Sequence, residues 1–487
     1  MNKENSRSLT CCSEYLQYRG QPEISAPTWQ QNESHIPTLS RRDIIRVGSL
    51  GIAAYSLLPI LKPRNVQAGT KVQPRGGAKI CILLFLSGGP SQPDTFDVKE
   101  GWWTPEDFDI QTIKPGLRMP VGLMPRLAER TNKYAIVRSL EAWEATHPRG
   151  AYYLQAGRLL SPARLHEIPS VGSVMAYESL RHRRDSDFLP PFISIGMDTS
   201  NLIGNGLLPP EAAPMVMFSD APPPFKLAEA DQAIFNRRRE LLGKIKPQKH
   251  SRGQLFGNLD QYYQSAYPLL NDTKASTVFN VDPKDHVRYG NSEMGDACAI
   301  ARNITEADAG TKFVFISCSQ WDLHADAYAG SATDKSQGQY KPCAELDSAL
   351  SSLLDDLEAT TDKQGRRLID KTFIGALGEF GRTPGPLTVN KGRDHYRYAG
   401  VGLFAGAGVN AKVLGATNEI GGRVIDTGWH KRRSIYPEDV LATMYSVMGI
   451  DWTKKITQTP TGRPFEYIET ISPKGHMAFS EISELFA

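Results

Sequence analysis

Six short apolar segments recur along the chain, separated by stretches of mixed polar and apolar residues. They are residues 79–86, 134–137, 191–195, 312–317, 373–377 and 399–405. Uninterrupted apolar runs of this length are typical of strands that are buried on both faces of a parallel sheet. The amphipathic segment 344–357 lies between two of them and is predicted to be a crossover helix. This order predicts an α/β fold with a mostly parallel central sheet and helices on both faces.

The pattern changes between about residues 222 and 309. This stretch opens with three prolines, and its segments 227–244, 258–270 and 292–303 are predicted to be helices. We interpret it as a helical insertion that covers the edge of the sheet or the mouth of a site. The insertion belongs to one domain that spans residues 69–487. Further helices are predicted at residues 151–160, 170–180 and 437–449.

The amino-terminal segment has the pattern of an export signal. Arg41 and Arg42 precede the apolar run 47–61, and Val66-Gln67-Ala68 follows with small residues at the positions that a signal peptidase requires. Paired arginines, a short apolar run and this cleavage pattern predict a twin-arginine signal peptide over residues 1–68. The run is shorter than the roughly 20 residues that span a bilayer. A core helix after a basic turn and an uncleaved anchor are the alternatives.

Export by this route would involve the twin-arginine translocase and would place the protein in the periplasm or outside a bacterial cell. We expect no stable membrane span in the mature chain. The first 68 residues hold 8 Lys and Arg against 5 Asp and Glu, so the net charge of +3 comes from them. The neutral remainder predicts no binding of nucleic acid, which requires concentrated positive charge.

Polar side chains cluster where the predicted strands end. Asp322 and His324 follow the segment 312–317, Glu379 follows 373–377, and Asp394 and His395 precede 399–405. In open α/β sheets, ligands bind outside the carboxyl ends of the strands. Carboxylate and imidazole donors together suit zinc, manganese or iron. The spacing therefore predicts a site for a divalent metal ion, zinc or manganese, although each motif alone is also compatible with a structural loop.

A second group of residues suits an anion. His147 and Arg149 lie at the start of a predicted helix that follows a strand, and Arg382 follows the segment 373–377. Helix amino termini favour anions, and arginines neutralise negative charge that builds up on a transferred group. His147, Arg149 and Arg382 are therefore the candidate catalytic residues. A lone histidine in this position is also compatible with a structural role.

Several motifs together resemble a known family. They are LLFLSGGPSQPDTFD (83–97), HPRGAYYLQAGR (147–158), WDLH (321–324), GEFGRTP (378–384), GRDH (392–395) and PEDVLATMYSVMGID (437–451). The chain resembles the exported bacterial, sulfatase-like "domain of unknown function" family within the alkaline phosphatase superfamily. The resemblance implies an alkaline phosphatase-like three-layer α/β/α fold with metal ions at the carboxyl edge of the sheet.

The chain departs from the sulfatase pattern at the position of the nucleophile. Sulfatases carry their nucleophile ten positions before the glycine of a Gly-Arg pair, and in this chain His147 lies ten positions before Gly157. Imidazole cannot become formylglycine, so ordinary sulfatase chemistry is not expected, and His147 would act as ligand, base or nucleophile. The resemblance further implies that Asp322, His324 and His395 bind one metal ion, while a second metal site is degraded.

These patterns lead to two functional hypotheses. The first is an exported metal-dependent hydrolase of a phosphate or sulfate ester, with a small-molecule or polysaccharide substrate, in which Glu379 or Asp394 completes the metal shell. The second is a non-catalytic binding protein of the cell envelope on a degenerate alkaline phosphatase-like scaffold. The presence of His147 at the position of the usual nucleophile favours the second hypothesis. The clustering of carboxylate and imidazole side chains at the ends of the predicted strands favours the first.

Overall fold

The computed structural model describes most of the chain after its first 71 residues. The described residues are 72–197, 201–220, 229–244, 273–459, 461–469, 471–472, 475–476 and 478–487. The predicted signal peptide, residues 1–68, and the predicted helix at residues 258–270 lie outside them. Within the described ranges, no helix is long and apolar enough to cross a membrane.

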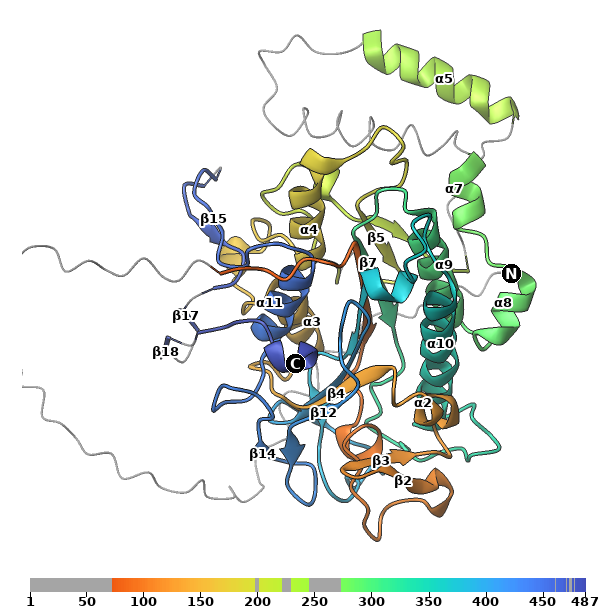
Figure 1. Cartoon of the computed structure of the whole chain (residues 1–487), viewed down its shortest axis with the longest axis vertical. Helices are drawn as coiled ribbons and strands as arrows, with labels where there is room; N and C mark the ends of the chain where they lie inside the picture. Colours follow the sequence, from red (N-terminus) through yellow and green to blue (C-terminus); the bar gives the residue numbers. More distant parts are fainter. Residues whose placement is uncertain are drawn as a thin grey trace, which may run out of the picture. The chain divides into compact units, whose positions relative to one another are not determined.

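An eight-stranded sheet forms the centre of the described chain (Figure 1). All its neighbouring strands pair in parallel except β11, which is antiparallel to β4 on one side and to β8 on the other. This arrangement confirms the predicted α/β fold with a mostly parallel sheet. In spatial order the strands are β12 (Val413–Leu414), β4 (Tyr134–Leu140), β11 (Gly400–Ala405), β8 (Thr372–Leu377), β1 (Ile80–Leu86), β7 (Phe313–Cys318), β5 (Phe192–Ile195) and β6 (Met215–Met217).

Helices cover both faces of the sheet. Alternate side chains of β1 face opposite layers, with Ile82 and Leu84 on one side and Leu83 and Phe85 on the other, which makes the strand apolar throughout. The layer next to Leu83 contains α3 (His147–Ala156), α4 (Val171–Ser179) and α11 (Pro437–Val447), and the layer next to Ile82 contains α2 (Pro125–Glu129), α9 (Glu293–Ala307) and α10 (Tyr340–Ala359).

Smaller elements complete the described chain. Further helices are α5 (Glu229–Lys244), α7 (Thr273–Val278) and α8 (Pro283–Arg288). Two-stranded pairs are formed by β2 (Ile110–Lys114) with β3 (Leu117–Pro120), β9 (Gly381–Arg382) with β10 (His395–Tyr396), β13 (Ala416–Thr417) with β14 (Val424–Asp426), β15 (Lys455–Ile456) with β16 (Phe465–Glu466), and β17 (Ile471–Ser472) with β18 (Gly475–His476).

The stretch predicted as a helical insertion, residues 222–309, ends in a core helix. α9 packs against β7 and α10, and its residues Cys298, Ala299 and Ile300 have no exposed surface. The helix at 292–303 was expected to cover an edge or a site mouth, whereas α9 belongs to one of the two helical layers. The apolar residues that recur along α9 explain this position, because they need a buried face.

Two element boundaries differ from the sequence expectation. The helix expected at residues 151–160 is α3, which ends at Ala156 because Gly157 adopts a left-handed conformation (φ 60°) and donates its N–H to the carbonyl of Tyr153. The strand expected at residues 134–137 continues as β4 to Leu140. Arg138 lies inside this strand, buried, with its Nε donating to the carbonyl of Phe96 at 2.7 Å. Arg138 interrupts the apolar pattern, so the sequence predicted a strand that is too short.

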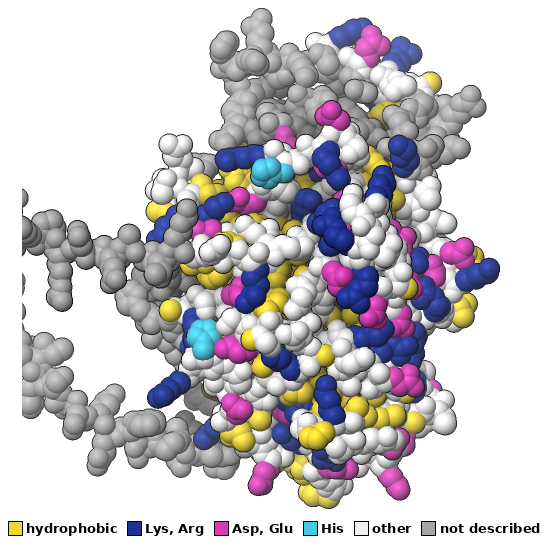
Figure 2. Space-filling view, viewed as in Figure 1, with side chains coloured by type: hydrophobic (Ala, Val, Ile, Leu, Met, Phe, Trp, Pro, Cys, Tyr) yellow, Lys and Arg dark blue, Asp and Glu magenta, His cyan; other side chains and the backbone are white. Residues whose placement is uncertain are grey.

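Charges of both signs mix on the surface. On the face shown in Figure 2, Lys and Arg side chains lie among Asp and Glu side chains rather than in a separate stripe. Some charged side chains of the described chain form ion pairs between neighbouring helices, since Arg288 and Arg302 both pair with Asp356. The prediction that the chain binds no nucleic acid is compatible with this face and remains a prediction.

A buried acid joins α3 to α11. Glu438 lies in the first turn of α11, is 3% exposed, and accepts a hydrogen bond of 2.6 Å from the hydroxyl of Tyr153 in α3. Burial raises the pKa of Glu438 to about 8, although the hydrogen bond from Tyr153 opposes the shift. Glu438 therefore retains its proton in the folded chain at pH values where the unfolded chain has lost it.

This raised pKa predicts how stability depends on pH. The contribution of Glu438 is fully present below the unfolded pKa of 4.5 and is lost as the pH rises through the folded pKa of about 8. The free energy of unfolding of the wild type should fall relative to that of Glu438→Gln by up to about 5 kcal/mol over this range. Urea denaturation of both chains at half-unit pH steps measures the difference.

Tyr153→Phe is the matched control for this measurement. It removes the hydrogen bond that lowers the pKa of Glu438 and keeps the ring, so the pH at which the loss of stability ends should move upward. A difference between wild type and Glu438→Gln that stays constant from pH 5 to 8 would show that Glu438 does not titrate in this way.

Candidate metal centre

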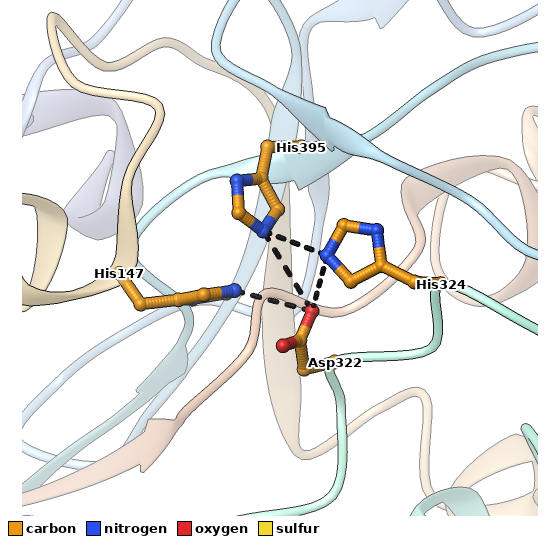
Figure 3. Close-up of side chains that lie close together, drawn as sticks. All are labelled: His147, Asp322, His324 and His395. Carbon is orange, nitrogen blue, oxygen red and sulfur yellow. Dashed lines mark hydrogen bonds and ion pairs between the residues drawn. The ribbon is translucent and has the colours of Figure 1, made fainter. Parts of the chain in front are cut away.

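Four side chains converge at one edge of the sheet (Figure 3). Nε2 of His147, His324 and His395 and a carboxylate oxygen of Asp322 all lie within 4.8 Å of one another. Oδ1 of Asp322 is 3.1 Å from Nε2 of His147, 3.0 Å from Nε2 of His324 and 3.7 Å from Nε2 of His395. The structure thus brings together the three residues expected to bind metal, and it adds His147 to them.

The topology of the sheet explains this convergence. Asp322 and His324 follow the carboxyl end of β7, and His147 is the first residue of α3, which follows β4. His395 lies in β10, before β11. Because β11 runs antiparallel to its neighbours, the segment that enters it lies at the edge where the parallel strands end. Four residues from three distant parts of the chain therefore meet at the carboxyl edge of the sheet.

In each of the three imidazole rings, Nδ1 lies within hydrogen-bond distance of an oxygen acceptor. The pairs are His147 Nδ1 with Glu379 Oε1 at 2.5 Å, His324 Nδ1 with Asp394 Oδ1 at 2.8 Å, and His395 Nδ1 with the carbonyl of Ala145 at 2.7 Å. A carbonyl oxygen only accepts, and a carboxylate at neutral pH does the same, so these contacts assign the proton to each Nδ1. In the neutral ring, each Nε2 then presents a lone pair to the cluster.

These lone pairs fit a cation. Nε2 of His324 and Nε2 of His395 are 2.9 Å apart, a distance at which two acceptors repel unless a proton or a metal ion lies between them. Nε2 of His147 is buried and makes no hydrogen bond of acceptable geometry within the described residues. Three imidazole nitrogens with a carboxylate, each ring supported through Nδ1, are a donor set suited to zinc, manganese or iron.

The charges around the cluster also call for a cation. Asp322, Glu379 and Asp394 contribute three carboxylates, and Arg382 contributes one guanidinium, which lies 2.5 Å from Oδ1 of Asp322. With neutral histidines, two negative charges remain uncompensated among these groups. One divalent ion would balance them.

The acids and bases of the cluster shift one another's protonation. Burial alone would raise the pKa of Asp322, but the surrounding side chains of His147, His395 and Arg382 hold it well below its usual range. Burial alone would lower the pKa of His147, but its contacts with the carboxylates of Asp322 and Glu379 raise it to about 9. Without a metal ion the ring therefore holds a second proton at neutral pH, which an ion bound at Nε2 would displace. The carboxylate of Asp322 is thus ionised at neutral pH, as a metal ligand must be.

Glu379 and Asp394, expected to complete the metal shell, lie behind the histidines instead. Glu379 is buried and accepts hydrogen bonds from His147 and, through both carboxylate oxygens, from the N–H of Gly88 at 3.1 and 3.2 Å. Asp394 is exposed and contacts the far nitrogen of His324. The group of four convergent ligand atoms includes neither residue. Their positions suit orienting the rings rather than direct coordination.

The candidate catalytic arginines have other partners. Arg149 is 55% exposed and forms a two-point ion pair with Glu144, at 2.9 Å from Nε and 2.7 Å from Nη2. Arg382 is 1% exposed and contacts Asp322. The structure therefore does not place Arg149 among the four ligands, and it places Arg382 behind one of them.

Two further arginines near the motifs pair with acids elsewhere in the fold. Arg158 contacts Glu469 at 3.0 Å, and Arg393 forms a two-point pair with Asp94, at 2.6 and 3.0 Å. Both arginines are buried. Asp94 belongs to the segment after β1, and it anchors the neighbouring segment that carries Arg393 instead of joining the cluster.

Two glycines allow the ligand loops to touch through their backbones. A Cβ at Gly88 would lie 2.4 Å from the backbone nitrogen of Asp322, and Gly88 has φ of 109°. A Cβ at Gly392 would lie 2.0 Å from the carbonyl carbon of His324. Only glycine permits these approaches. Sequence reasoning missed this role, as it missed the carbonyl of Ala145, because backbone contacts leave no side-chain signal.

Comparison with known proteins gives distant structural similarities and one family. No curated protein matches this sequence. A protein of the alkaline phosphatase superfamily from Vibrio parahaemolyticus is 11% identical, with a TM-score of 0.38, over 78% of this chain and 69% of its own. A sulfatase from Pseudoalteromonas sp. is 12% identical, with a TM-score of 0.34, over 85% and 72% of the two chains. A phosphonate monoester hydrolase from Silicibacter pomeroyi is 10% identical, with a TM-score of 0.32, over 77% and 73%.

The family match covers most of the chain. A family model described as a protein of unknown function, DUF1501, matches residues 78–473. This range contains the strands of the central sheet and all four residues of the cluster. The chain belongs to the DUF1501 family.

Proposed function

We propose that this protein is an exported, metal-dependent hydrolase of an anionic ester, either a phosphate or a sulfate. The observation that carries the proposal is the convergence of Asp322, His147, His324 and His395 within 4.8 Å. When bound there, a zinc or manganese ion supplies Lewis acidity toward an ester oxygen and toward water. The substrate would be a small molecule or a polysaccharide that carries the ester.

Solvent access favours catalysis over a structural role for the ion. The side chains of the four ligands are between 25% and 44% exposed. Structural zinc sites are closed by four protein ligands, whereas catalytic sites keep a position for water or substrate. This cluster also offers four protein ligands, so a water or an ester would have to bind as a fifth ligand, which a five-coordinate ion permits. A half-exposed cluster is compatible with such a position, and an ester could approach it from solvent.

The residues of the chain have distinct proposed roles. His147, His324 and His395 bind the ion through Nε2, because their Nδ1 atoms are held by oxygen acceptors. Glu379 and Asp394 fix the rings of His147 and His324 and keep the proton on Nδ1. As a ligand, His147 has no free nitrogen with which to act as a nucleophile, so we assign it to the metal and not to a covalent intermediate.

We propose that Arg149 binds the anionic group of the substrate. It lies two residues after His147 in the first turn of α3, where the helix dipole also favours negative charge. Its guanidinium is largely exposed, and its pair with Glu144 uses two of its five donors. A substrate anion could therefore be bound through the remaining donors or by exchange with Glu144.

We also propose that residues 1–68 direct export through the twin-arginine translocase. The support is the sequence pattern of Arg41, Arg42, the apolar run 47–61 and the Val66-Gln67-Ala68 site. Export by this route follows folding in the cytoplasm, so the metal ion would be bound before the chain crosses the membrane.

The first test concerns metal binding. The full chain should bind one divalent ion, and His395→Ala should weaken its affinity by at least the 10–100-fold that is typical for loss of a supporting partner. Elemental analysis and competition with a chromogenic chelator measure stoichiometry and affinity. His430→Ala is the matched control, because His430 pairs with Glu484 and does not belong to the cluster.

The outcome of this test separates the two functional hypotheses. Stoichiometric metal in His395→Ala at wild-type affinity would refute the assignment of the ligands. Metal binding combined with turnover of p-nitrophenyl phosphate or p-nitrophenyl sulfate supports the hydrolase. Metal binding without turnover of any phosphate or sulfate ester would favour the non-catalytic envelope protein.

The second test concerns the anion. Arg149→Ala should raise KM for the hydrolysed ester by about 10-fold or more, as expected for a charged hydrogen bond worth roughly 1.5–3 kcal/mol, with metal content unchanged. Arg184→Ala serves as the control, since Arg184 is similarly exposed but pairs with Asp187 and Asp308. An unchanged KM in Arg149→Ala would remove this residue from the substrate site.

The third test concerns export. Replacing Arg41 and Arg42 together by lysine should retain the full chain in the cytoplasm, because translocation by this route depends on the arginine pair. Fractionation of a bacterial host that expresses the chain gives the result. Arg7→Lys and Arg19→Lys, which lie outside the pair, should be exported normally. Export of the doubly substituted chain at the wild-type level would exclude this route.

A further inference from the structure

A buried arginine connects the loops that carry the ligands. Arg382 is 1% exposed, so its guanidinium cannot be reached by a substrate in this conformation. Its Nε donates to the carbonyl of Gly88 at 2.9 Å, its Nη1 donates to the carbonyl of Arg393 at 2.9 Å, and its Nη2 contacts both Gly88 and Oδ1 of Asp322. The side chain therefore touches the loop after β1, the loop after β7 and the segment that leads to β10.

The backbone of Arg382 makes similar connections. Its N–H donates to Oε1 of Gln92 at 2.8 Å, and its carbonyl accepts from Nε2 of the same side chain at 2.7 Å. In the small β9–β10 pair, Arg382 lies opposite His395. Arg382 is thus adjacent to one metal ligand through its backbone and to another, Asp322, through its side chain.

Asp322 needs such a contact more than the other ligands do. Its side chain is 44% exposed, and its loop includes Gln320, which adopts a positive φ of 83°. A half-exposed carboxylate can rotate into solvent, whereas the three histidines are each fixed through Nδ1. The contact of 2.5 Å from Nη2 holds Oδ1 of Asp322 toward the three Nε2 atoms.

We propose that Arg382 is a positioning residue, which sets the geometry of the metal centre by holding Asp322 and the surrounding loops, and that it does not bind the substrate. This inference rests on the proposed metal site, and it replaces the sequence expectation that Arg382 neutralises charge on the transferred group. Two effects oppose each other here. The guanidinium competes with a metal ion for Oδ1 of Asp322. It also restricts the carboxylate before the ion binds, so that less conformational entropy is lost on binding.

In this role, the restriction of the Asp322 carboxylate outweighs the competition between Arg382 and the ion for Oδ1. Loss of the guanidinium should then weaken metal binding, even though it removes a competing cation. Lysine retains the positive charge but lacks the planar fork that contacts Gly88, Asp322 and Arg393 at once. The Lys variant should therefore show most of the defect, which a purely electrostatic role would not produce.

The test compares metal affinity in three variants of the full chain. Arg382→Met and Arg382→Lys should each bind zinc about 10–100-fold more weakly than the wild type, as outer partners of metal ligands typically do. Arg158→Met is the matched control, because Arg158 is also buried and pairs with Glu469 away from the cluster. It should keep the wild-type affinity. Competition with a chromogenic chelator gives the affinities, and circular dichroism verifies folding.

Each outcome decides the proposal. Wild-type or higher zinc affinity in a folded Arg382→Lys variant would overturn it, because competition for Asp322 would then be the larger effect. If Arg382→Met does not fold, the Lys variant alone decides. If the wild type binds zinc but hydrolyses no ester, the proposed function fails while the role of Arg382 is still measured. A wild type that binds no divalent metal would overturn both.

Discussion

The direction of β11 is the constraint on which the candidate centre depends. Parallel strands present their carboxyl ends at one edge of a sheet, and residues that precede a parallel strand lie at the opposite edge. His395 precedes β11, and it reaches Asp322 and His324 only because β11 is antiparallel to β4 and β8. The single reversed strand thereby brings its entry segment to the edge where the loop after β7 and the start of α3 already lie. The rest of the fold provides the layers that hold this edge rigid.

Negative charge is distributed in two shells around this edge. Asp322 lies among the three imidazole nitrogens, while Glu379 and Asp394 lie on their far sides. Burying Glu379 is costly, and the N–H of Gly88 and the ring of His147 offset that cost by hydrogen bonding to it. The outer carboxylates hold the proton on Nδ1 of His147 and His324, as the carbonyl of Ala145 does for His395, so that each Nε2 faces the cluster. The same residues therefore determine both the local stability and the chemistry that the cluster can support.

The sequence predicted six of the eight strands and the edge where the site lies, but it missed β6 and β12 and did not give the role of each residue. Apolar runs indicated the sheet because every side chain of β1 and β8 is buried. The run 399–405 did not indicate the direction of β11, since buried parallel and antiparallel strands have the same composition. Nor did residue types distinguish Glu379 and Asp394, which support rings, from Asp322, which joins the cluster. Loop conformations decide which of these acids joins the cluster. The role of Arg382 depends on them in the same way, because one of its partners is a backbone carbonyl, that of Gly88.

The backbone contacts at Gly88 and Gly392 have a consequence for how this centre can vary among related proteins. Since the loops rest on each other through main-chain atoms at these two positions, their spacing does not depend on which side chains point inward. The oxygen donor of Asp322 or the nitrogen donor of His324 can then be exchanged for another donor while the loops keep their places. A side chain at either glycine would instead widen the spacing and displace every donor at once. The donor atoms can therefore vary at the ligand positions, whereas a side chain at either glycine would alter the scaffold that carries them.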